Sequence, residues 1–499
     1  MSTTAADEAR VLASVPKGIL INGEWRDSSD GRAFDVIDPA TSLVLASVAD
    51  AAPADGMLAL DAAAAAQEGW AKTAPRYRAE ILRAAFERVT ALSDDFAILM
   101  SLEMGKPVAE ARGEVAYGAE FLRWFSEEAS RVSGRYGIAP DGKMRILVHK
   151  RPVGPSLFIT PWTFPLAMAT RKISPAVAAG CTMVLKPAAL TPLTSLLFAQ
   201  VMLDVGLPAG VLNVVQTTRA GAVTGPVIAD DRLRKLSFTG STGVGRRLIA
   251  DSAQSVLRVS MELGGNAPFL VFEDADVDKA VDGAMVAKLR NMGEACTAAN
   301  RLIVHESVVD EFATKLAAKM AVLTVARGTC DGAQIGPMID AKSRDNIHAM
   351  VENATTLGAR VLTGGILPEG EGYFYPPTVL IDVPREASVL HDEMFGPVAP
   401  IVSFKDEAEA VAIANDTEYG LVAYAYTSDL NRALRLSERL EVGMFGLNTG
   451  IVSNPAAPFG GVKASGLGRE GGAEGIEEYL ETVYIGIADP FADAIAENT

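Results

Sequence analysis

The sequence predicts an α/β protein with two doubly wound, Rossmann-type domains and a small β flap. Strand-like and helix-like segments alternate between residues 156 and 238, and a second alternating region runs from residue 267 to about residue 449. Such alternation is typical of parallel strands joined by right-handed helical crossovers. The chain has 499 residues, which is too long for one ordinary hydrophobic core, so at least two domains are expected.

The part of the chain before the first alternating region predicts short strands and long helices. Residues 1–15 carry Asp7 and Glu8 and lack a long apolar core, so they predict a frayed tail and not a signal peptide. Apolar side chains recur at helical spacing from residue 76, and Gly105-Lys-Pro107 is expected to end that helix. Strands are expected at 19–25 and 44–48, and helices at 59–70, 76–102 and 110–130.

The two alternating regions define the expected sheets, and a nucleotide-binding fold is the natural interpretation of the first. Its strands are expected at 156–160, 182–186, 211–215 and 235–238, and its helices at 167–179, 193–205, 221–230 and 244–253. In the second region a helix is expected at 276–289 and strands at 267–272, 301–305, 360–363 and 398–404.

Two strand-like segments, 145–151 and 482–487, fall outside both sheets. Exposed strand edges invite pairing between chains, so these segments predict a homodimer or homotetramer. The expected boundaries are 1–135 and 153–262 for a dinucleotide-binding domain, 263–460 for a catalytic domain, and 136–152 and 461–499 for oligomerisation segments.

Composition and charge limit the classes of function. The 45 basic and 62 acidic residues give a net charge of −17, which disfavours nucleic acid and anionic membranes as partners. No apolar run is long enough to span a bilayer. The 4 histidines are scattered without metal-ligand spacing, so no metal site is predicted. An anionic substrate would therefore need a local cationic pocket.

Three cysteines, Cys181, Cys296 and Cys330, are odd in number and widely spaced, which argues against a disulfide framework and suits a reducing cytoplasm. Cys296 lies in a polar, glycine-containing break after the helix expected at 276–289, where a thiol can face a cavity. It is therefore a candidate nucleophile. Cys181 is expected to pack at the start of a strand, and Cys330 to be structural or exposed in a loop.

A thiol attacks as the thiolate and needs a base, for which Glu262 is the candidate. Glu262 is followed by Leu263, Gly264 and Gly265, so the backbone there can approach another surface closely. The alternative interpretation is that Cys296 is one of the many buried, inert cysteines and Glu262 the solvated end of a strand.

Six motifs, in a characteristic order along the chain, favour the catalytic interpretation. They are Ile159-Thr-Pro-Trp-Thr-Phe-Pro165, Phe238-Thr-Gly-Ser-Thr242, Glu262-Leu-Gly-Gly-Asn-Ala-Pro268, Gly293-Glu-Ala-Cys296, Glu393-Met-Phe-Gly-Pro397 and Pro458-Phe-Gly-Gly-Val-Lys463. Together they closely resemble the aldehyde dehydrogenase superfamily, and the resemblance runs from about residue 18 to residue 484. Within that superfamily the chain looks most like the succinate-semialdehyde dehydrogenases. The family uses two segments outside its sheets as an oligomerisation flap, which agrees with the strands expected at 145–151 and 482–487.

The resemblance implies a cofactor site at the strand-to-helix turn of Gly240 and Ser241. Free backbone N–H groups and the helix dipole favour phosphate at such a turn, and Ser241 can cap the helix or donate to a phosphate oxygen. Lys186 matches the family lysine that contacts the adenosine ribose. In NAD-preferring members a glutamate commonly stands where this chain has Ala189, so NADP is favoured over NAD as the cofactor.

At the other end of the cofactor, Glu393 matches the family glutamate that holds the nicotinamide ribose. The resemblance assigns Trp162 and Phe395 to the same site. It also implies that Cys296 forms a thioester with the oxidised substrate and that Glu262 activates water to hydrolyse it. Members that transfer the acyl group to coenzyme A typically lack this glutamate, so a free acid is expected as the product.

The oxyanion site departs from the family pattern. The family stabilises the oxyanion with the main-chain N–H of the cysteine and with an asparagine amide, and this chain has Thr163 at the position of the asparagine. Threonine offers one rotatable hydroxyl in place of the amide. The sequence therefore predicts an active but slow enzyme.

Three residues match the carboxylate site of the succinate-semialdehyde dehydrogenases: Arg171, Arg290 and Ser453. Each alone is more often a surface cation or a turn serine. Together, two guanidiniums and a hydroxyl would fix a carboxylate by bidentate hydrogen bonds that lysine could not reproduce. Trp162, Phe164 and Phe459 would supply apolar walls, and simple core packing is an equally good interpretation of these aromatic residues.

The favoured activity is therefore the NAD(P)-dependent oxidation of succinate semialdehyde in the cytoplasm. Glutarate semialdehyde, or an aldehyde that bears a sulfonate, would also suit a pocket of arginines. A different class of protein, a weakly active homologue that binds the cofactor, remains a further alternative because of Thr163.

Overall fold

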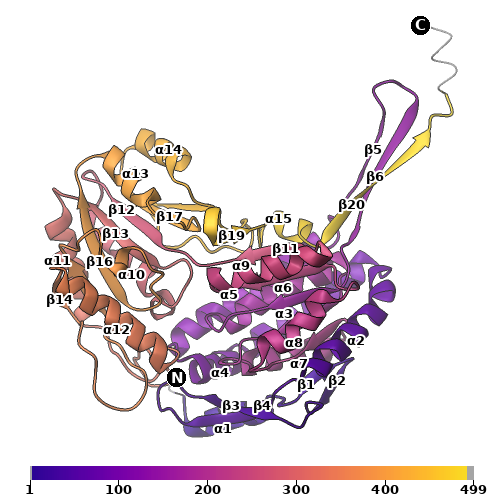
Figure 1. Ribbon diagram of the computed structural model, residues 1–499, viewed down its shortest axis with the longest axis horizontal. Coiled ribbons are helices and arrows are strands. Elements are labelled where there is room, and N and C mark those ends of the chain that lie inside the picture. The colour runs from indigo at the N-terminus through magenta and orange to yellow at the C-terminus, as the bar shows by residue number, and fades with distance from the viewer. Residues whose placement is uncertain (1–2, 492–499) are drawn as a thin grey trace.

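The computed structural model describes residues 3–491 and confirms the predicted α/β architecture, with two sheets covered by helices and a projecting β arm (Figure 1). The second domain lies on the left of this view, the first domain at the lower right, and the arm at the upper right. Within the described residues, every helix is too short or too polar to cross a membrane.

The first sheet has a parallel core with antiparallel strands at both edges. Its strands are β1 (Ile19–Ile21), β2 (Glu24–Arg26), β7 (Ser156–Ile159), β8 (Met183–Lys186), β9 (Leu212–Val214), β10 (Lys235–Thr239), β11 (Arg258–Glu262) and β19 (Gly466–Leu467). They lie in the order β19-β11-β10-β7-β8-β9-β1-β2. The order reverses between β7 and β10, and ligands of doubly wound sheets bind beyond the carboxyl ends of the strands at such a switch point.

Helices cover both faces of this sheet because its strands alternate their side chains between two hydrophobic clusters. Leu157 and Ile159 of β7 join one cluster, and Phe158 between them joins the other. The first cluster includes residues of α2 (Pro53–Ala71), α8 (Ala220–Ala229) and α9 (Thr242–Ser252). The second includes residues of α3 (Pro75–Ala91), α4 (Ser93–Met104), α5 (Val108–Glu128), α6 (Pro165–Ala179) and α7 (Leu193–Asp204).

The helix expected at 76–102 is in fact two helices, so that prediction is wrong at its centre. Leu92 leaves the helical region at φ −98° and ψ 19°, and α4 begins at the next residue. Asp94 and Asp95 follow in the first turn of α4, where acidic side chains are stabilised by the helix dipole. Gly105 ends α4 in the left-handed conformation, which confirms the expected stop.

The frayed tail expected at residues 1–15 is also wrong within the described part of the chain. Residues 5–14 form helix α1 (Ala5–Ser14), which begins with a capping box between Thr4 and Asp7 and buries Val11 completely. Ion pairs of 2.9 Å between Glu8 and Arg327 and of 2.8 Å between Arg10 and Asp95 fix this helix to both domains. A neighbouring hairpin consists of β3 (Ala33–Ile37) and β4 (Val44–Ala49).

The second sheet repeats the doubly wound design in the other domain. Its strands are β12 (Ala267–Val271), β13 (Ala299–His305), β14 (Arg360–Thr363), β15 (Thr378–Ile381), β16 (Val398–Phe404), β17 (Val422–Tyr426) and β18 (Met444–Leu447). They lie in the order β14-β15-β16-β13-β12-β17-β18, and β14 alone among them is antiparallel to its neighbour. The helices of this domain are α10 (Val277–Leu289), α11 (Val309–Ala321), α12 (Ala341–Thr356), α13 (Glu407–Asn415) and α14 (Leu430–Arg439).

The arm contains both strands that the sequence placed outside the two sheets. Strand β6 (Met144–Pro152) pairs antiparallel with β5 (Arg135–Ile138) on one side and with β20 (Leu480–Ala488) on the other. The predicted oligomerisation segment 461–499 needs correction, because β19 pairs with β11 in the first sheet and α15 (Glu474–Glu477) packs on α6. Residues 492–499 of that segment lie outside the described residues.

Candidate active site

Cys296 is presented by a strained turn after α10. Two non-glycine residues of the 3-10 turn η2 (Arg290–Gly293) adopt the left-handed conformation, Asn291 at φ 56° and Met292 at φ 59°. Asparagine tolerates this region, but a long unbranched side chain such as methionine rarely adopts it. The Asn291 amide locks the turn by donating to the carbonyl oxygens of Thr163 at 3.0 Å and Glu294 at 2.8 Å. Strained backbone of this kind is concentrated at functional sites.

The Cys296 thiol is partly exposed, whereas Cys181 is buried and Cys330 is exposed. The last two positions agree with the predictions from the sequence. Burial raises the pKa of Cys296 to about 12, and Glu262 adds to this, whereas Arg171 and Arg290 lower the pKa. The resting thiol is therefore protonated, so a base must remove the proton before the sulfur can attack.

Glu262 ends β11 close to the nucleophile. A side chain at Gly265 would place its Cβ 2.4 Å from the carbonyl oxygen of Cys296, so this segment and the Cys296 loop touch as expected from the glycines. Glu262 is 3% exposed, and its Oε2 has no hydrogen-bond partner among residues 3–491. Burial raises the pKa of Glu262 well above its ordinary value, and repulsion by Glu470 raises it further. A raised pKa suits a general base near neutral pH.

A buried charge cluster lies beside Glu262, and the sequence predictions missed two of its three members. Glu470 forms ion pairs with Arg171 and, at 2.6 Å, with Lys172, and all three side chains are almost fully buried. Burial opposes ionisation of Glu470, but the two cations lower its pKa below the ordinary value. Every residue of α6 is buried, and two adjacent cations on such a helix require a buried anion. That requirement was the signal for a partner such as Glu470.

Thr163 is held against the nucleophile loop by its backbone. Its carbonyl oxygen accepts hydrogen bonds from Asn291 and, at 2.9 Å, from the Nζ of Lys106. Lys106 in turn pairs with Glu114, whose Oε1 accepts from the backbone N–H groups at the start of α6. The Thr163 side chain is buried, and its hydroxyl makes no hydrogen bond with the rest of residues 3–491. Lys106, Glu114 and Asn291 were not predicted from the sequence.

A cavity of 480 Å³ contains two of the three predicted carboxylate-binding residues. The Nη1 of Arg290 donates to the Ser453 hydroxyl at 2.8 Å, and the Arg290 guanidinium lies 5.1 Å from the centre of the Phe164 ring. Arg171 is held separately, since its guanidinium pairs with Glu470 and lies 4.3 Å from the centre of the Phe459 ring. The cavity is lined by Ala109, Glu110, Gly113, Glu114, Tyr117, Phe164, Arg290, Asn291, Ile451 and Ser453.

The residues predicted to bind the adenosine half of a cofactor lie at the carboxyl edge of the first sheet. Lys186 ends β8 beside Ile159 of β7, and burial lowers the pKa of its ammonium to about 8. Gly240 follows β10, and Ser241 stands at the N-cap of α9 with an exposed side chain that makes no capping hydrogen bond. The start of α9 thus has free donors, as binding of a phosphate requires. Ala189 is partly exposed in the turn after β8.

The residues predicted for the nicotinamide half come from both domains. Glu393 accepts a hydrogen bond from the Gly265 N–H at 2.8 Å, and a Cβ at Gly264 would lie 2.6 Å from its Oε2. The rings of Trp162 and Phe395 meet edge to face with centres 6.0 Å apart. These positions place Glu393, Trp162 and Phe395 near the switch point and the nucleophile segment, so the side chains present fit a dinucleotide cofactor.

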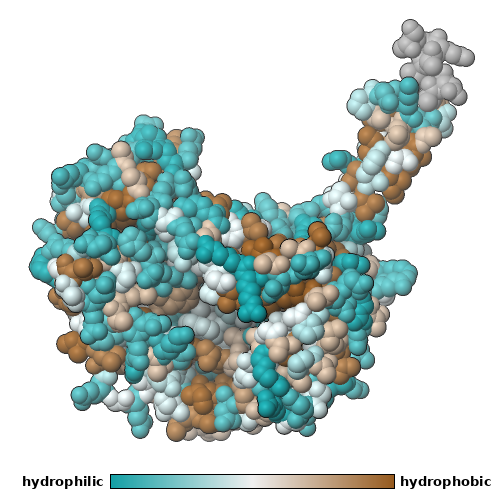
Figure 2. Space-filling model, in the orientation of Figure 1, coloured by the Kyte–Doolittle hydropathy of each residue, from teal (hydrophilic) through white to brown (hydrophobic). Residues whose placement is uncertain are grey.

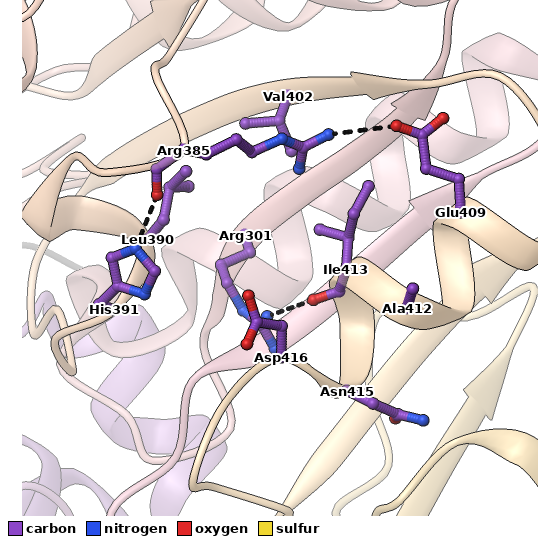
Figure 3. Close-up of a pocket in the computed structure, with 10 residues that line it drawn as sticks. All are labelled: Arg301, Arg385, Leu390, His391, Val402, Glu409, Ala412, Ile413, Asn415 and Asp416. Atoms are coloured by element: carbon purple, nitrogen blue, oxygen red, sulfur yellow. Dashed lines mark hydrogen bonds and ion pairs between the residues drawn. The ribbon is translucent and has the colours of Figure 1, made fainter.

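A second large hollow, of 560 Å³, lies in the second domain and contains none of the predicted site residues (Figure 3). Arg301 donates to the carbonyl oxygens of Asn266, Ile413 and Ala414 at 2.8 to 3.0 Å, so three of its five N–H donors are already used. Arg385 points toward Glu409, at 3.7 Å (Figure 3). Because it contains none of the residues predicted for the site, this hollow is not part of the candidate site.

The chain belongs to the aldehyde dehydrogenase family, whose model matches residues 25–485. It is therefore an oxidoreductase of the class that acts on aldehydes. A crystal structure described as an E. coli NADP-dependent enzyme superimposes with a TM-score of 0.94 at 49% identity, covering 96% of this chain and 99% of that one.

Three curated relatives with named substrates are similar to this chain over nearly their whole length. A succinate-semialdehyde dehydrogenase of Paenarthrobacter nicotinovorans is 65% identical over 90% of this chain and all of its own. A glutarate-semialdehyde dehydrogenase of Pseudomonas putida is 50% identical, covering 94% of this chain and 97% of the relative. The NADP(+)-linked succinate-semialdehyde dehydrogenase GabD of Escherichia coli is also 50% identical, covering 93% and 96%.

Proposed function

We propose that this enzyme oxidises a semialdehyde bearing a carboxylate, with succinate semialdehyde favoured, to the dicarboxylic acid. The observation that carries the proposal is the Arg290 guanidinium, which is hydrogen-bonded to Ser453 on the wall of the 480 Å³ cavity. A guanidinium with free N–H groups binds a carboxylate in preference to an uncharged group. The names of the relatives at 65% and 50% identity support the same class of substrate.

The chemistry begins with the transfer of the Cys296 proton to Glu262. The Sγ thiolate then adds to the aldehyde carbon, and the new oxyanion is stabilised by the Cys296 N–H and by the Thr163 hydroxyl. A nicotinamide cofactor held by Lys186, Ser241 and Glu393 would supply the acceptor for the hydride that leaves this carbon. A thioester on Cys296 remains. Glu262 passes the first proton to solvent and then removes a proton from water, which attacks the thioester carbon, breaks the C–S bond and releases the acid. The proton on Glu262 then returns to the Cys296 sulfur.

Glutarate semialdehyde is a second candidate substrate. It carries the same carboxylate on a chain longer by one methylene, and the relative from Pseudomonas putida is named for it. An aldehyde bearing a sulfonate would present three oxygens to the same donors. These alternatives differ in length and in the shape of the anion, so a steady-state comparison of the three aldehydes decides among them.

The proposed cofactor is NADP, with NAD as the weaker alternative. Lys186 forms no ion pair with any of residues 3–491, and an unpaired, nearly buried cation favours an anion such as a 2′-phosphate. A carboxylate at position 189 would repel the 2′-phosphate of NADP and would accept a hydrogen bond from the 2′-hydroxyl of NAD. Ala189, in the turn after β8, does neither. NADP is therefore expected to have at least the kcat/KM of NAD, and Ala189→Glu is expected to reverse the preference. A wild type that strongly prefers NAD would contradict this assignment.

Replacing Arg290 by alanine tests the proposed substrate class. The loss of a charge partner in a partly buried site is expected to cost about 2–5 kcal/mol in transition-state binding of succinate semialdehyde. Butanal has the same length and no carboxylate, so its kcat/KM should change little. The measurement is kcat/KM for both aldehydes with the wild type and the variant. Equal losses for the two substrates would mean that Arg290 does not bind the carboxylate.

Thr163 is expected to limit the rate of the wild type. Loss of one oxyanion donor in a water-excluded site typically costs on the order of a hundredfold to a thousandfold in kcat. Thr163→Asn should therefore raise the single-turnover rate of cofactor reduction at saturating semialdehyde, with little change in the KM for the cofactor. A variant that is no faster would mean that the threonine hydroxyl, or another group, already stabilises the oxyanion as well as an asparagine amide would. That outcome would also remove the reason for considering a weakly active homologue.

The assembly and the location are proposed from surface and composition. The arm carries apolar side chains that face solvent, as the brown surface in Figure 2 illustrates. The most exposed of them are Tyr136, Ile138, Tyr484, Ile485 and Ile487, at 40% to 64%. Apolar strands with open edges are stabilised by pairing with another chain, so we propose a cytoplasmic homodimer or homotetramer. A monomer in sedimentation equilibrium would contradict this assembly.

A further inference from the structure

We infer that Tyr117 is a specificity-determining residue that donates its phenolic hydroxyl to the anionic end of the substrate. The inference rests on the proposed function and extends it, because it adds a fourth side chain to Arg171, Arg290 and Ser453. Tyr117 lies on α5, which carries no residue predicted from the sequence for the site.

The ring of Tyr117 forms part of the wall of the 480 Å³ cavity. The Arg290 guanidinium lies 5.4 Å from the centre of this ring, on the same cavity wall as Ser453. Phe121 fixes the ring from the other side by an edge-to-face contact with centres 5.0 Å apart. Tyr117 also packs against the small cluster of Phe164 and its neighbours that flanks Cys296. The position of the ring is therefore set by packing and does not depend on the hydroxyl.

The hydroxyl of Tyr117 is buried and has no hydrogen-bond partner among residues 3–491. Leaving a buried hydroxyl unpaired costs free energy, so its presence in a well-packed site calls for a partner that binds there. Arg171 presents a second such group, since its Nη2 is also buried without a partner in the described residues. Burial opposes the charge of Arg171, but Glu470 and then Tyr117 are the main groups that raise its pKa above the ordinary value.

Most of the unpaired groups on or beside the wall of this cavity can donate, and the exception is the Oδ1 of Asn291, which accepts and has no partner among residues 3–491. The Nη2 of Arg171 and the remaining N–H groups of Arg290 are donors only. Ser453 accepts from Arg290, so its own proton is left to donate. Tyr117 completes this set with a phenolic O–H. A ligand that satisfies this excess of donors must be an acceptor with several lone pairs, which describes a carboxylate and also a sulfonate.

The test compares Tyr117→Phe with the wild type on succinate semialdehyde and on butanal. Removing one hydrogen bond to a carboxylate is expected to raise the KM for succinate semialdehyde by roughly tenfold to a hundredfold, with kcat little changed. The inhibition constant of succinate should rise by a similar factor. Both kinetic constants for butanal should stay the same, because butanal offers no anion to the hydroxyl.

A purely structural role is separated by stability and by a matched control. Tyr117→Phe keeps the ring and removes an unpaired hydroxyl, so its Tm should be unchanged or higher. Tyr375→Phe removes another buried hydroxyl, which lies 3.3 Å from the Nδ1 of His348 in the second domain, and should leave the KM for both aldehydes unchanged. Unchanged kinetics in Tyr117→Phe, or equal losses for the two aldehydes, would overturn the inference. If Arg290→Ala lowers kcat/KM for succinate semialdehyde but not for butanal, the proposed function survives that result.

Discussion

Cys296→Ser is expected to abolish aldehyde oxidation while the protein still binds the cofactor. Serine keeps the shape of the side chain but replaces the thiol by a far weaker nucleophile at neutral pH. Loss of a catalytic nucleophile can reduce kcat on the order of 10⁶-fold. The cofactor residues Lys186 and Ser241 belong to the first sheet and α9, whereas Cys296 follows α10, so binding of the dinucleotide should persist. The measurements are steady-state reduction of NADP and titration of cofactor binding.

Cys330→Ser is the matched control for this prediction. Cys330 is also a free cysteine, but it is exposed and lies near Arg112 and Asp331, away from the catalytic loop. Its replacement is expected to leave kcat/KM unchanged. Substantial activity in Cys296→Ser would contradict the assignment of the nucleophile, as would a complete loss in the control.

The second large effect is expected for Glu262→Gln. Glutamine has nearly the same shape as glutamate and cannot accept a proton, so hydrolysis of the thioester should stall. Solvent water takes the thiol proton in this variant, so one equivalent of reduced cofactor per active site is expected in a burst, followed by slow turnover. The measurement is rapid mixing of the variant with aldehyde and cofactor. Full turnover without a burst would contradict the role of Glu262.

The pH dependence provides a further check on Glu262. Burial and Glu470 raise the pKa of Glu262, so the protonated, inactive form persists to a higher pH than for an ordinary carboxyl. The steady-state rate of the wild type should therefore increase with pH as this proton is lost. Glu262→Gln should lack this increase, and Glu80→Gln, which changes an exposed carboxylate on α3, should retain it. An unchanged pH profile in Glu262→Gln would mean that another group is the base.

The elements that the sequence predicted best are strands in which every residue is buried. Strands β7, β8 and β10 were expected within a residue or two of their observed bounds, because their apolar runs are short and bounded by turn residues. Strand β17 (Val422–Tyr426) was missed, although it is buried throughout, because a short apolar run can belong to a helix or to a strand. The break at Leu92 was missed because the apolar spacing continues across it.

The sequence indicated which segments carry the site but not how its charges are paired. Arg171 was predicted to bind substrate, and the structure adds Glu470 and Lys172 as its buried neighbours. Glu470 is about 300 positions from Arg171 in a chain of 499 residues, and pairing over that separation depends on the fold, not on local spacing. The unpaired hydroxyl of Tyr117 could not be predicted either. Helical spacing indicates which side of the helix Tyr117 lies on, but it does not show whether the hydroxyl has a hydrogen-bond partner.

The central claim is that the oxidised substrate is held as a thioester on Cys296 until Glu262 activates water. The most direct test is to mix Glu262→Gln with succinate semialdehyde and NADP, quench the reaction after the burst, and map the modified peptide by mass spectrometry. We expect the mass of one succinyl group on the peptide that contains Cys296, and no modification of Cys181 or Cys330. A succinyl group on either of those cysteines, or a burst of reduced cofactor that leaves Cys296 unmodified, would contradict the account.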